Sequence, residues 1–240
     1  MKIEIVPSQE ELAERGLDIF LGAASEAISQ RGMFSVGLAG GNTPEKLYTL
    51  LGRDERARDL NWEKIHIFFG DERAVPPDDK RSNYRLARLT FLEAVGIRDT
   101  NVHRIKAETG DLDEAAQEYE GQLNEVFGSE VPVFDMILLG MGADGHTASL
   151  FPGDSENIES DSLVCAVYRS GNEPDRISLG PRALRAGRRI VVLVAGSHKA
   201  EVLREVMTES PDPLKRPIRT LWEVPDKVLW LADSDAASLL

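Results

Sequence analysis

An Asp-x-His pair in the stretch GMGADGHTASLFPG, residues 140–153, is the part of the sequence best suited to acid–base chemistry. His146 lies two residues after Asp144, and glycines flank the turn. A carboxylate at this spacing can hold one imidazole nitrogen and leave the other free to take a proton from water. We therefore expect His146 to act as a general base that Asp144 orients. We interpret His66, inside the apolar run KIHIFF, and His103 as structural.

The same stretch has the Gly-x-Gly-x-x-Gly spacing of a dinucleotide-binding loop. That fingerprint needs a full helix after its glycines and an acidic residue at the end of the next strand, about 20 positions on. Pro152 and Gly153 end any helix here after at most two turns. Glu159 and Asp161 precede the next apolar run instead of ending it. We therefore interpret the match as accidental.

A second unusual loop, AGGNTPEKLY, follows the apolar run MFSVGL. Gly40 and Gly41 let backbone N–H groups approach a ligand, Thr43 is a suitable N-cap, and Pro44 suits the first helical position. Because a helix N-terminus attracts negative charge, this loop predicts an anion site. An ordinary strand-to-helix turn is the alternative.

Two further loops place charges directly after apolar runs. In GDERAVP, Asp71 and Arg73 follow KIHIFF, and they are either functional or part of a solvated loop. In AGSHKAEVL, Ser197 is a plausible N-cap and Lys199 lies in the first helical turn. A cation there opposes the helix dipole, and a bound anion would remove that penalty. A surface lysine that points away is the alternative.

The sequence lacks the motifs that other common catalytic mechanisms require. It has no Gly-x-Ser-x-Gly nucleophile elbow, no clustered His and Cys residues for zinc, and no Gly-x-x-x-x-Gly-Lys-Ser/Thr phosphate loop. The residues that remain favour metal-free acid–base chemistry beside an anion site.

The elements that must position these loops alternate between helices and strands. Ser8 and Glu11 form a capping box before a helix that should end at Gly32. Strands are expected at residues 33–39, 64–69, 134–139, 162–168 and 188–195, and helices at 111–127 and 197–207. This order predicts an α/β fold of three layers, α/β/α, with a mostly parallel sheet of Rossmann-like type and helices on both faces. Ligands bind such sheets at the carboxyl ends of the strands, where the four loops lie.

The length of 240 residues favours a single domain spanning residues 1–240. The chain has 41 acidic and 28 basic residues, for a formal net charge of -13. This charge opposes binding to nucleic acid or to an anionic membrane, so we expect neither partner.

The N-terminus lacks an apolar signal core and no segment reaches the ~20 apolar residues of a spanning helix, so we expect a cytoplasmic protein. Cys165 is the only cysteine and is expected in a buried strand, and nothing indicates an oligomeric state.

In this order the four loops resemble the 6-phosphogluconolactonases, which are themselves similar to the glucosamine-6-phosphate deaminases. The resemblance rests on GLAGGNTPEKLY, FFGDERAVPPDDKRSNYRLAR, FDMILLGMGADGHTASLFPG and RISLGPRALRAGRRIVVLVAGSHKAEVL. The deaminase pattern has Asp-Glu-Tyr where this chain has DER, and Asn-Glu-Pro where it has SLFP. Both differences favour the lactonases. The chain departs from the lactonase pattern at Ser178 and Gly180 and keeps Arg176.

The resemblance implies hydrolysis of 6-phospho-D-glucono-1,5-lactone to 6-phosphogluconate, the second step of the oxidative pentose phosphate pathway, without a cofactor or a metal. It makes His146 the base and Asp144 its orienting group. The residues implied in binding phosphate or sugar oxygens are Gly40, Gly41, Asn42, Thr43, Asp71, Arg73, Arg176 and Lys199. A deaminase/isomerase acting on an aminosugar phosphate and a non-catalytic sugar-phosphate sensor remain as alternatives.

Overall fold

A seven-stranded parallel sheet forms the centre of the computed structural model, which describes residues 2–240. Its strand order is β1-β10-β9-β6-β2-β3-β5, and every pair in it is parallel. The strands are β1 (Lys2–Val6), β2 (Phe34–Leu38), β3 (Ile65–Phe69), β5 (Val102–His103), β6 (Met136–Gly140), β9 (Ile190–Val194) and β10 (Val228–Asp233). The central strands are buried on both faces, which requires helices on each side of the sheet.

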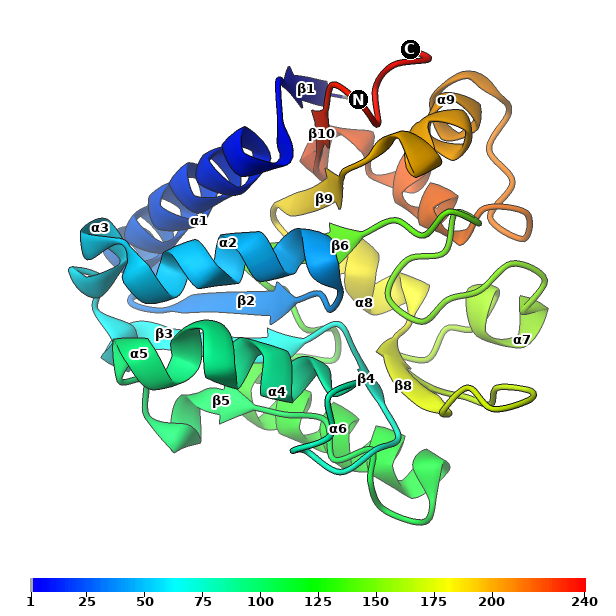
Figure 1. Cartoon of the computed structure of the whole chain (residues 1–240). Helices are drawn as coiled ribbons and strands as arrows, with labels where there is room; N and C mark the ends of the chain where they lie inside the picture. Colours follow the sequence, from blue (N-terminus) through cyan, green and yellow to red (C-terminus); the bar gives the residue numbers. More distant parts are fainter. Residues whose placement is uncertain (1) are drawn as a thin grey trace.

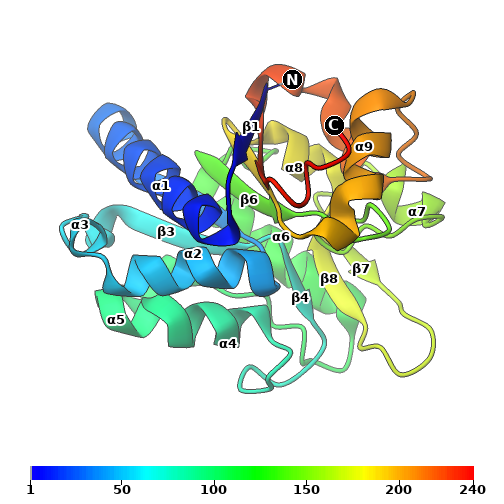
Figure 2. The same ribbon diagram turned by 45° about the horizontal axis from the view of Figure 1, so that its top comes forward.

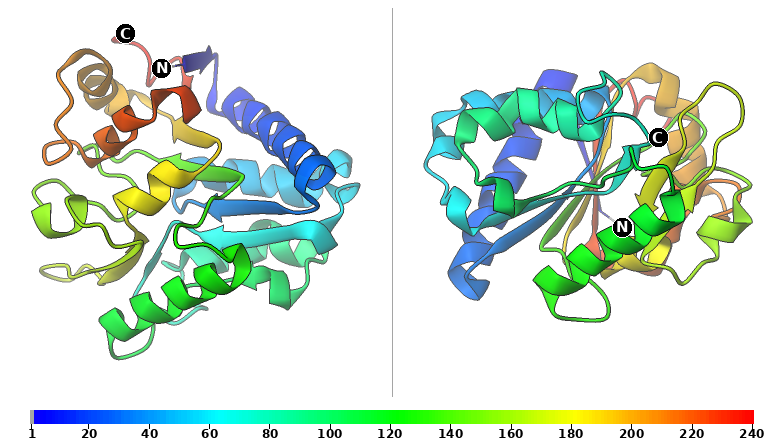
Figure 3. Two further views of the ribbon diagram at one scale, coloured as in Figure 1. Left: turned by 180° about the vertical axis from the view of Figure 1, so that it is seen from behind. Right: turned by 90° about the horizontal axis from the view of Figure 1, so that it is seen from below.

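The helices cover both faces of this sheet, as a three-layer α/β/α fold requires. They are α1 (Gln9–Arg31), α2 (Asn42–Arg53), α3 (Glu55–Arg58), α4 (Asn83–Ala87), α5 (Glu93–Val95), α6 (Leu112–Phe127), α7 (Ser155–Ile158), α8 (Pro181–Ala186) and α9 (Ala200–Thr208). A π-helical turn spans Arg88–Leu92, and short 3-10 helices span Trp62–Lys64, Asp99–Asn101, Ser197–Lys199, Pro217–Glu223 and Pro225–Lys227. Figure 3 shows α1 and α2 on one side of the sheet and α6 and α8 on the other. The predicted fold class is confirmed.

The first helix begins and ends where its sequence predicts. The Ser8 side chain accepts a hydrogen bond from the backbone N–H of Glu11 at 3.2 Å, and Gly32 ends the helix with a φ of 82°. Leu12, Phe20 and other apolar side chains on one face of the helix are buried. The helix therefore attaches to the sheet through the face that its periodicity indicates.

A small antiparallel sheet differs from the prediction. It contains β4 (Asp71–Arg73), β8 (Arg176–Leu179) and β7 (Val164–Val167), in the order β4-β8-β7. The strand expected at residues 162–168 is present as Val164–Val167, with Cys165 buried, but it belongs to this sheet and not to the parallel one. The two sheets join through Gly70, whose N–H donates to Leu38 of β2 and whose carbonyl accepts from Leu179 of β8.

The small sheet lies beside the carboxyl ends of the central parallel strands (Figures 1 and 2). One hydrophobic core contains buried side chains of both sheets, such as Val36 and Val192 of the parallel sheet and Ile177 and Leu179 of the antiparallel one. This shared core fixes the second sheet against the end of the first, where the predicted site residues lie. The single domain expected for residues 1–240 stays a prediction.

Candidate active site

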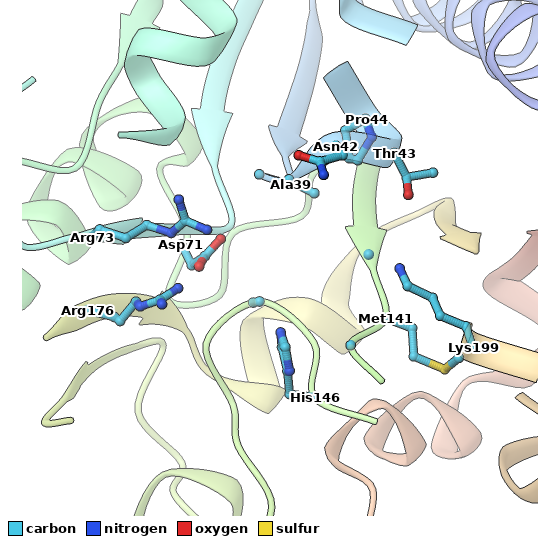
Figure 4. A pocket seen from close by; sticks show the side chains of 15 residues that line it. Ala39, Asn42, Thr43, Pro44, Asp71, Arg73, Met141, His146, Arg176 and Lys199 are labelled. Carbon is cyan, nitrogen blue, oxygen red and sulfur yellow. The ribbon is translucent and has the colours of Figure 1, made fainter. Parts of the chain in front are cut away.

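A pocket of about 240 Å³ opens where the small sheet meets the carboxyl ends of β2 and β6 (Figure 4). Pockets that bind drug-sized ligands measure roughly 300–1,000 Å³, so this smaller pocket suits a small metabolite. The predicted site residues that line it are Gly40, Gly41, Asn42, Thr43, Asp71, Arg73, His146, Arg176 and Lys199. Asp144 is the one predicted site residue outside the lining, and it contacts His146 directly. The structure thus brings together residues that are far apart in the sequence.

The His146 imidazole is held by Asp144. The Nδ1 atom of His146 lies 2.6 Å from Oδ1 of Asp144, and the same oxygen accepts the backbone N–H of His146 at 3.1 Å. Burial alone would raise the pKa of Asp144, but these hydrogen bonds outweigh it and lower the pKa to about 2. An ionised Asp144 accepts a hydrogen bond from the Nδ1–H group, so the lone pair of His146 lies on Nε2. Figure 4 shows the ring pointing into the pocket.

Gly142 leaves the space in which this pair forms. A methyl group on Gly142 would lie 2.1 Å from Nδ1 of His146 and 2.7 Å from Oδ1 of Asp144. The backbone N–H of Gly142 also donates to the carbonyl of His146 at 2.9 Å, which closes the turn. Residues 147–154, which follow this turn, form no helix, and Thr147 and Leu150 pair there in an isolated bridge. This geometry excludes the dinucleotide fingerprint and agrees with the sequence interpretation.

The glycine loop ends at the N-terminus of α2, but the predicted cap is wrong. The helix begins at Asn42 and its N-cap is Gly41, whose φ of 94° a side-chain-bearing residue rarely adopts. Thr43 is therefore inside the first turn, and no side chain caps the helix. The first backbone N–H groups of α2 face the pocket that Asn42 and Thr43 line, which is the arrangement that binds an anion.

Lys199 lies on the other side of the pocket, at the junction with α9. Ser197 does not act as a cap, because residues 197–199 form a 3-10 turn that begins at Gly196 and Lys199 is itself the N-cap of α9. Burial lowers the pKa of Lys199, and the nearby Asp233 carboxylate partly offsets that effect. Within residues 2–240 its ammonium makes no ion pair closer than 4.0 Å, and Lys199 lines the pocket, where an anion can reach it. The alternative of an outward-pointing surface lysine is excluded.

The acidic and basic residues after β3 form a strand and not a solvated loop. Asp71 pairs with Ser178 and Arg73 with Arg176 across β4 and β8, which brings two guanidinium groups together at one wall of the pocket. Burial, and then the positive charge of Arg73, lower the pKa of Arg176. Asp71 lies between these arginines and the interior, and its side chain is buried.

Two buried residues that hold Asp71 were not predicted as site residues. Asn83 donates from Nδ2 to the backbone carbonyl of Asp71 at 2.8 Å and to its Oδ1 at 3.0 Å. Ser149 donates from its hydroxyl to Oδ2 of Asp71 at 2.7 Å. Glu72, which points the opposite way, accepts the backbone N–H groups of Asn83 and Tyr84 and so fixes the start of α4. The sequence signal for Asn83 was the Ser-Asn dipeptide downstream of DER.

The described residues contain neither a membrane-spanning helix nor a metal-binding cluster. Among residues 2–240, no helix combines the length and the apolar character that crossing a bilayer requires. In the same part of the chain, no three His, Cys, Asp or Glu side chains gather closely enough to hold a metal ion.

The sequence and the fold are similar to those of a group of sugar-phosphate enzymes. Residues 7–230 match the family described as glucosamine-6-phosphate isomerases/6-phosphogluconolactonase. The chain belongs to this family. A 6-phosphogluconolactonase of Synechocystis sp. is 37% identical over 242 residues, which cover 100% of this chain and 98% of that protein.

Solved structures of both branches of the glucosamine-6-phosphate isomerase/6-phosphogluconolactonase family resemble this one. A 6-phosphogluconolactonase from Trypanosoma cruzi has a TM-score of 0.84 and 28% identity, and the match covers 100% of this chain and 96% of that one. A monomeric glucosamine-6-phosphate deaminase has a TM-score of 0.86 and 25% identity over 100% of both chains. Because the two reactions share one fold, the side chains in the pocket must distinguish them.

Proposed function

We propose that this chain hydrolyses 6-phospho-D-glucono-1,5-lactone to 6-phospho-D-gluconate in the oxidative pentose phosphate pathway. The observation that carries the proposal is a histidine oriented by a carboxylate, with its free nitrogen in a pocket whose other walls carry three cations. The base is His146, and the cations are Arg73, Arg176 and Lys199. A phosphorylated lactone has an anionic end that suits the cations and an ester carbonyl that water can attack.

The proposed reaction uses His146 first as a base and then as an acid. Nε2 takes a proton from water while the water oxygen forms a bond to the lactone carbonyl carbon. The bond between that carbon and the ring oxygen then breaks, and the imidazolium returns its proton to the departing oxygen, which becomes a hydroxyl group. Asp144 stabilises the imidazolium between these steps and keeps Nδ1 as the protonated nitrogen. Water is the only co-reactant, so no cofactor is needed.

The phosphate end of the substrate is assigned to Lys199 and the N-terminus of α2. Lys199 is half-buried and makes no ion pair within 4.0 Å in the described chain, and a phosphate would supply a negative charge beside it. The first N–H groups of α2 have no side-chain cap and face the same space. A charge-assisted hydrogen bond from Lys199 and backbone donors from residues 41–43 would together anchor the phosphate.

The sugar end is assigned to the opposite wall. Arg73 and Arg176 line this wall of the pocket, and each guanidinium group carries several N–H donors that suit lactone oxygens. Asp71 accepts hydrogen bonds at both carboxylate oxygens from Asn83 and Ser149, which holds it in one orientation beside the arginines. We assign Asp71 to contacts with substrate hydroxyl groups.

We also propose a cytoplasmic location and a small-molecule partner. The reaction belongs with cytoplasmic sugar-phosphate metabolism, and the partner is a small sugar-phosphate lactone. A net charge of -13 opposes a nucleic-acid partner, and the cations that we assign to the ligand are gathered in the pocket.

A substrate comparison tests this proposal. Purified protein should accelerate hydrolysis of 6-phosphogluconolactone well above the buffer rate, with the product measured through its dehydrogenase. The same preparation should release no ammonia from glucosamine 6-phosphate, and it should hydrolyse unphosphorylated gluconolactone much more slowly, because the remote phosphate positions the carbonyl. Ammonia release at a comparable rate would favour a deaminase, and sugar-phosphate binding without either reaction would favour a sensor.

A further inference from the structure

Residues 216–218, at the start of the Pro217–Glu223 helix, contact the turn that carries His146 and Asp144. Two successive carbonyl groups of that turn each accept a hydrogen bond from this segment. Arg216 donates from Nη1 to the carbonyl of Asp144 at 3.1 Å, and the backbone N–H of Ile218 donates to the carbonyl of Gly145 at 3.0 Å. The segment and the turn are thus attached at adjacent peptide groups.

The contact is close because Gly145 has no side chain. Its φ is 81°, and a methyl group there would lie 2.5 Å from Cδ of Arg216. The apolar stem of Arg216 therefore packs on the Gly145 backbone while its guanidinium reaches back to Asp144. A larger residue at position 145 would displace the arginine.

The same guanidinium is also fixed to α9. Its Nη2 and Nε atoms lie 2.7 Å and 3.1 Å from Oε2 of Glu205, and the two side chains are only 21% and 16% exposed. The side-chain hydrogen bond from Arg216 lowers the pKa of Glu205, so the pair stays charged. Glu205 lies in the helix whose N-cap is Lys199. One arginine therefore connects the helix of the phosphate-binding lysine to the turn of the proposed base.

We propose that Arg216 is a positioning residue that sets His146 relative to Lys199, through its contacts with Glu205 and the carbonyl of Asp144. This inference rests on the proposed function, since the two subsites must hold opposite ends of one substrate. Arg216 touches neither the pocket nor the reacting atoms. It acts by holding the Asp144–His146 turn at a fixed separation from the start of α9.

The test compares Arg216→Met with a matched control, Arg15→Met. Methionine keeps most of the apolar stem and removes the guanidinium. Arg15 also pairs with a glutamate, Glu4, but it joins α1 to β1 away from the pocket. Because small misplacements of reacting groups can cost about 100-fold, Arg216→Met should lower kcat by about 10- to 100-fold. KM and inhibition by inorganic phosphate should stay within threefold, and Arg15→Met should leave kcat unchanged.

A proton NMR measurement separates positioning from general stabilisation. The Nδ1 proton of His146, hydrogen-bonded to Asp144, should give a far-downfield resonance that His146→Gln abolishes and Arg15→Met retains. Arg216→Met should broaden or shift it. Glu205→Gln keeps the shape of the contact and removes its charge. It should lower kcat and broaden or shift the resonance to a smaller extent, and it replaces Arg216→Met in the test if that variant does not fold.

An unchanged resonance together with a kcat within twofold of the parent would overturn the proposal, even if the melting temperature falls. The NMR measurement does not depend on lactone hydrolysis. If the parent protein hydrolyses no lactone, the proposed function fails, while loss or retention of the resonance in Arg216→Met still decides whether this residue positions the turn.

Discussion

His146 and Asp144 are joined by two hydrogen bonds to one oxygen: Oδ1 of Asp144 lies 2.6 Å from Nδ1 of the ring and accepts the backbone N–H of His146 at 3.1 Å. The second bond fixes the carboxylate to the same residue that it orients. The imidazole therefore has a defined tautomer and a defined direction before any substrate binds. A general base needs both properties.

Gly142→Ala should damage this pair without unfolding the protein. The added methyl group would lie 2.1 Å from Nδ1 of His146, so the ring or the turn must move. We expect kcat to fall by about 10- to 100-fold because the base is displaced, with KM changed much less. Gly121→Ala in α6 is the control, since a methyl group there meets nothing within 4 Å. Steady-state kinetics of both variants provide the measurement, and equal activity in the two would contradict the close approach at Gly142.

Lys199→Met should weaken binding and spare turnover. The phosphate does not react, so its contact with Lys199 is similar in the ground and transition states. Loss of one charge-assisted hydrogen bond costs roughly 1.5 to 3 kcal/mol, or about 10- to 150-fold in KM. Inorganic phosphate should also inhibit the variant less strongly. Lys64→Met, at an exposed position, is the control. An unchanged KM would remove Lys199 from the phosphate site.

The pair formed by His66 and His103 predicts a loss of stability in acid. The two rings lie 3.0 Å apart between Nδ1 and Nε2, and burial, with a smaller contribution from His66, lowers the pKa of His103 to about 4. An imidazole in the unfolded chain titrates near 6.5. Between about pH 6.5 and 4 the unfolded state therefore binds more protons, and the free energy of unfolding decreases as the pH falls through this window.

His103→Phe should reduce that decrease by about 1 kcal/mol between pH 7.5 and pH 5, after allowance for solvent screening. Phenylalanine keeps the stacking on Phe68, whose ring centroid is 4.3 Å from that of His103. Urea unfolding at the two pH values measures the difference. His198→Gln, at an exposed position, is the control and should show the parental decrease. The same decrease in His103→Phe would assign the acid sensitivity to other groups.

Activity should survive exhaustive treatment with a chelator. A catalytic zinc takes three protein ligands, yet the pocket offers one imidazole, His146, whose Nδ1 is already bonded to Asp144. The oxygens of Asp71 are likewise occupied by Asn83 and Ser149. Lactone hydrolysis before and after dialysis against the chelator is the measurement. Lost activity that added zinc or magnesium restores would show that a metal takes part.

The sequence predicted the elements whose signals are local. The first helix follows from Ser8, Glu11 and the spacing of its apolar residues, all within one segment. The pairing of residues 162–168 could not be predicted in the same way, because a short apolar run looks alike in a parallel and an antiparallel sheet. Thr43 and Ser197 were wrongly predicted as caps because glycines, Gly41 and Gly196, take those positions through the backbone alone.

The site was predicted as a set of residues but not as a network. His146, Lys199 and the glycine loop carry chemistry that their neighbours in the sequence indicate. The groups that hold them come from far along the chain: Ser149 reaches Asp71 across 78 positions, and Arg216 reaches Asp144 across 72. Such contacts depend on how the sheets and loops pack, and no local spacing encodes them.

The most direct test of the central claim is kcat for 6-phosphogluconolactone in the parent protein and in His146→Gln, with spontaneous hydrolysis subtracted. Glutamine keeps much of the ring volume and removes the nitrogen that would take the proton from water. General-base assistance is typically worth 10²–10⁴-fold, so kcat should fall by about that factor while inhibition by inorganic phosphate is retained. A kcat within threefold of the parent would contradict the role of His146 as the base.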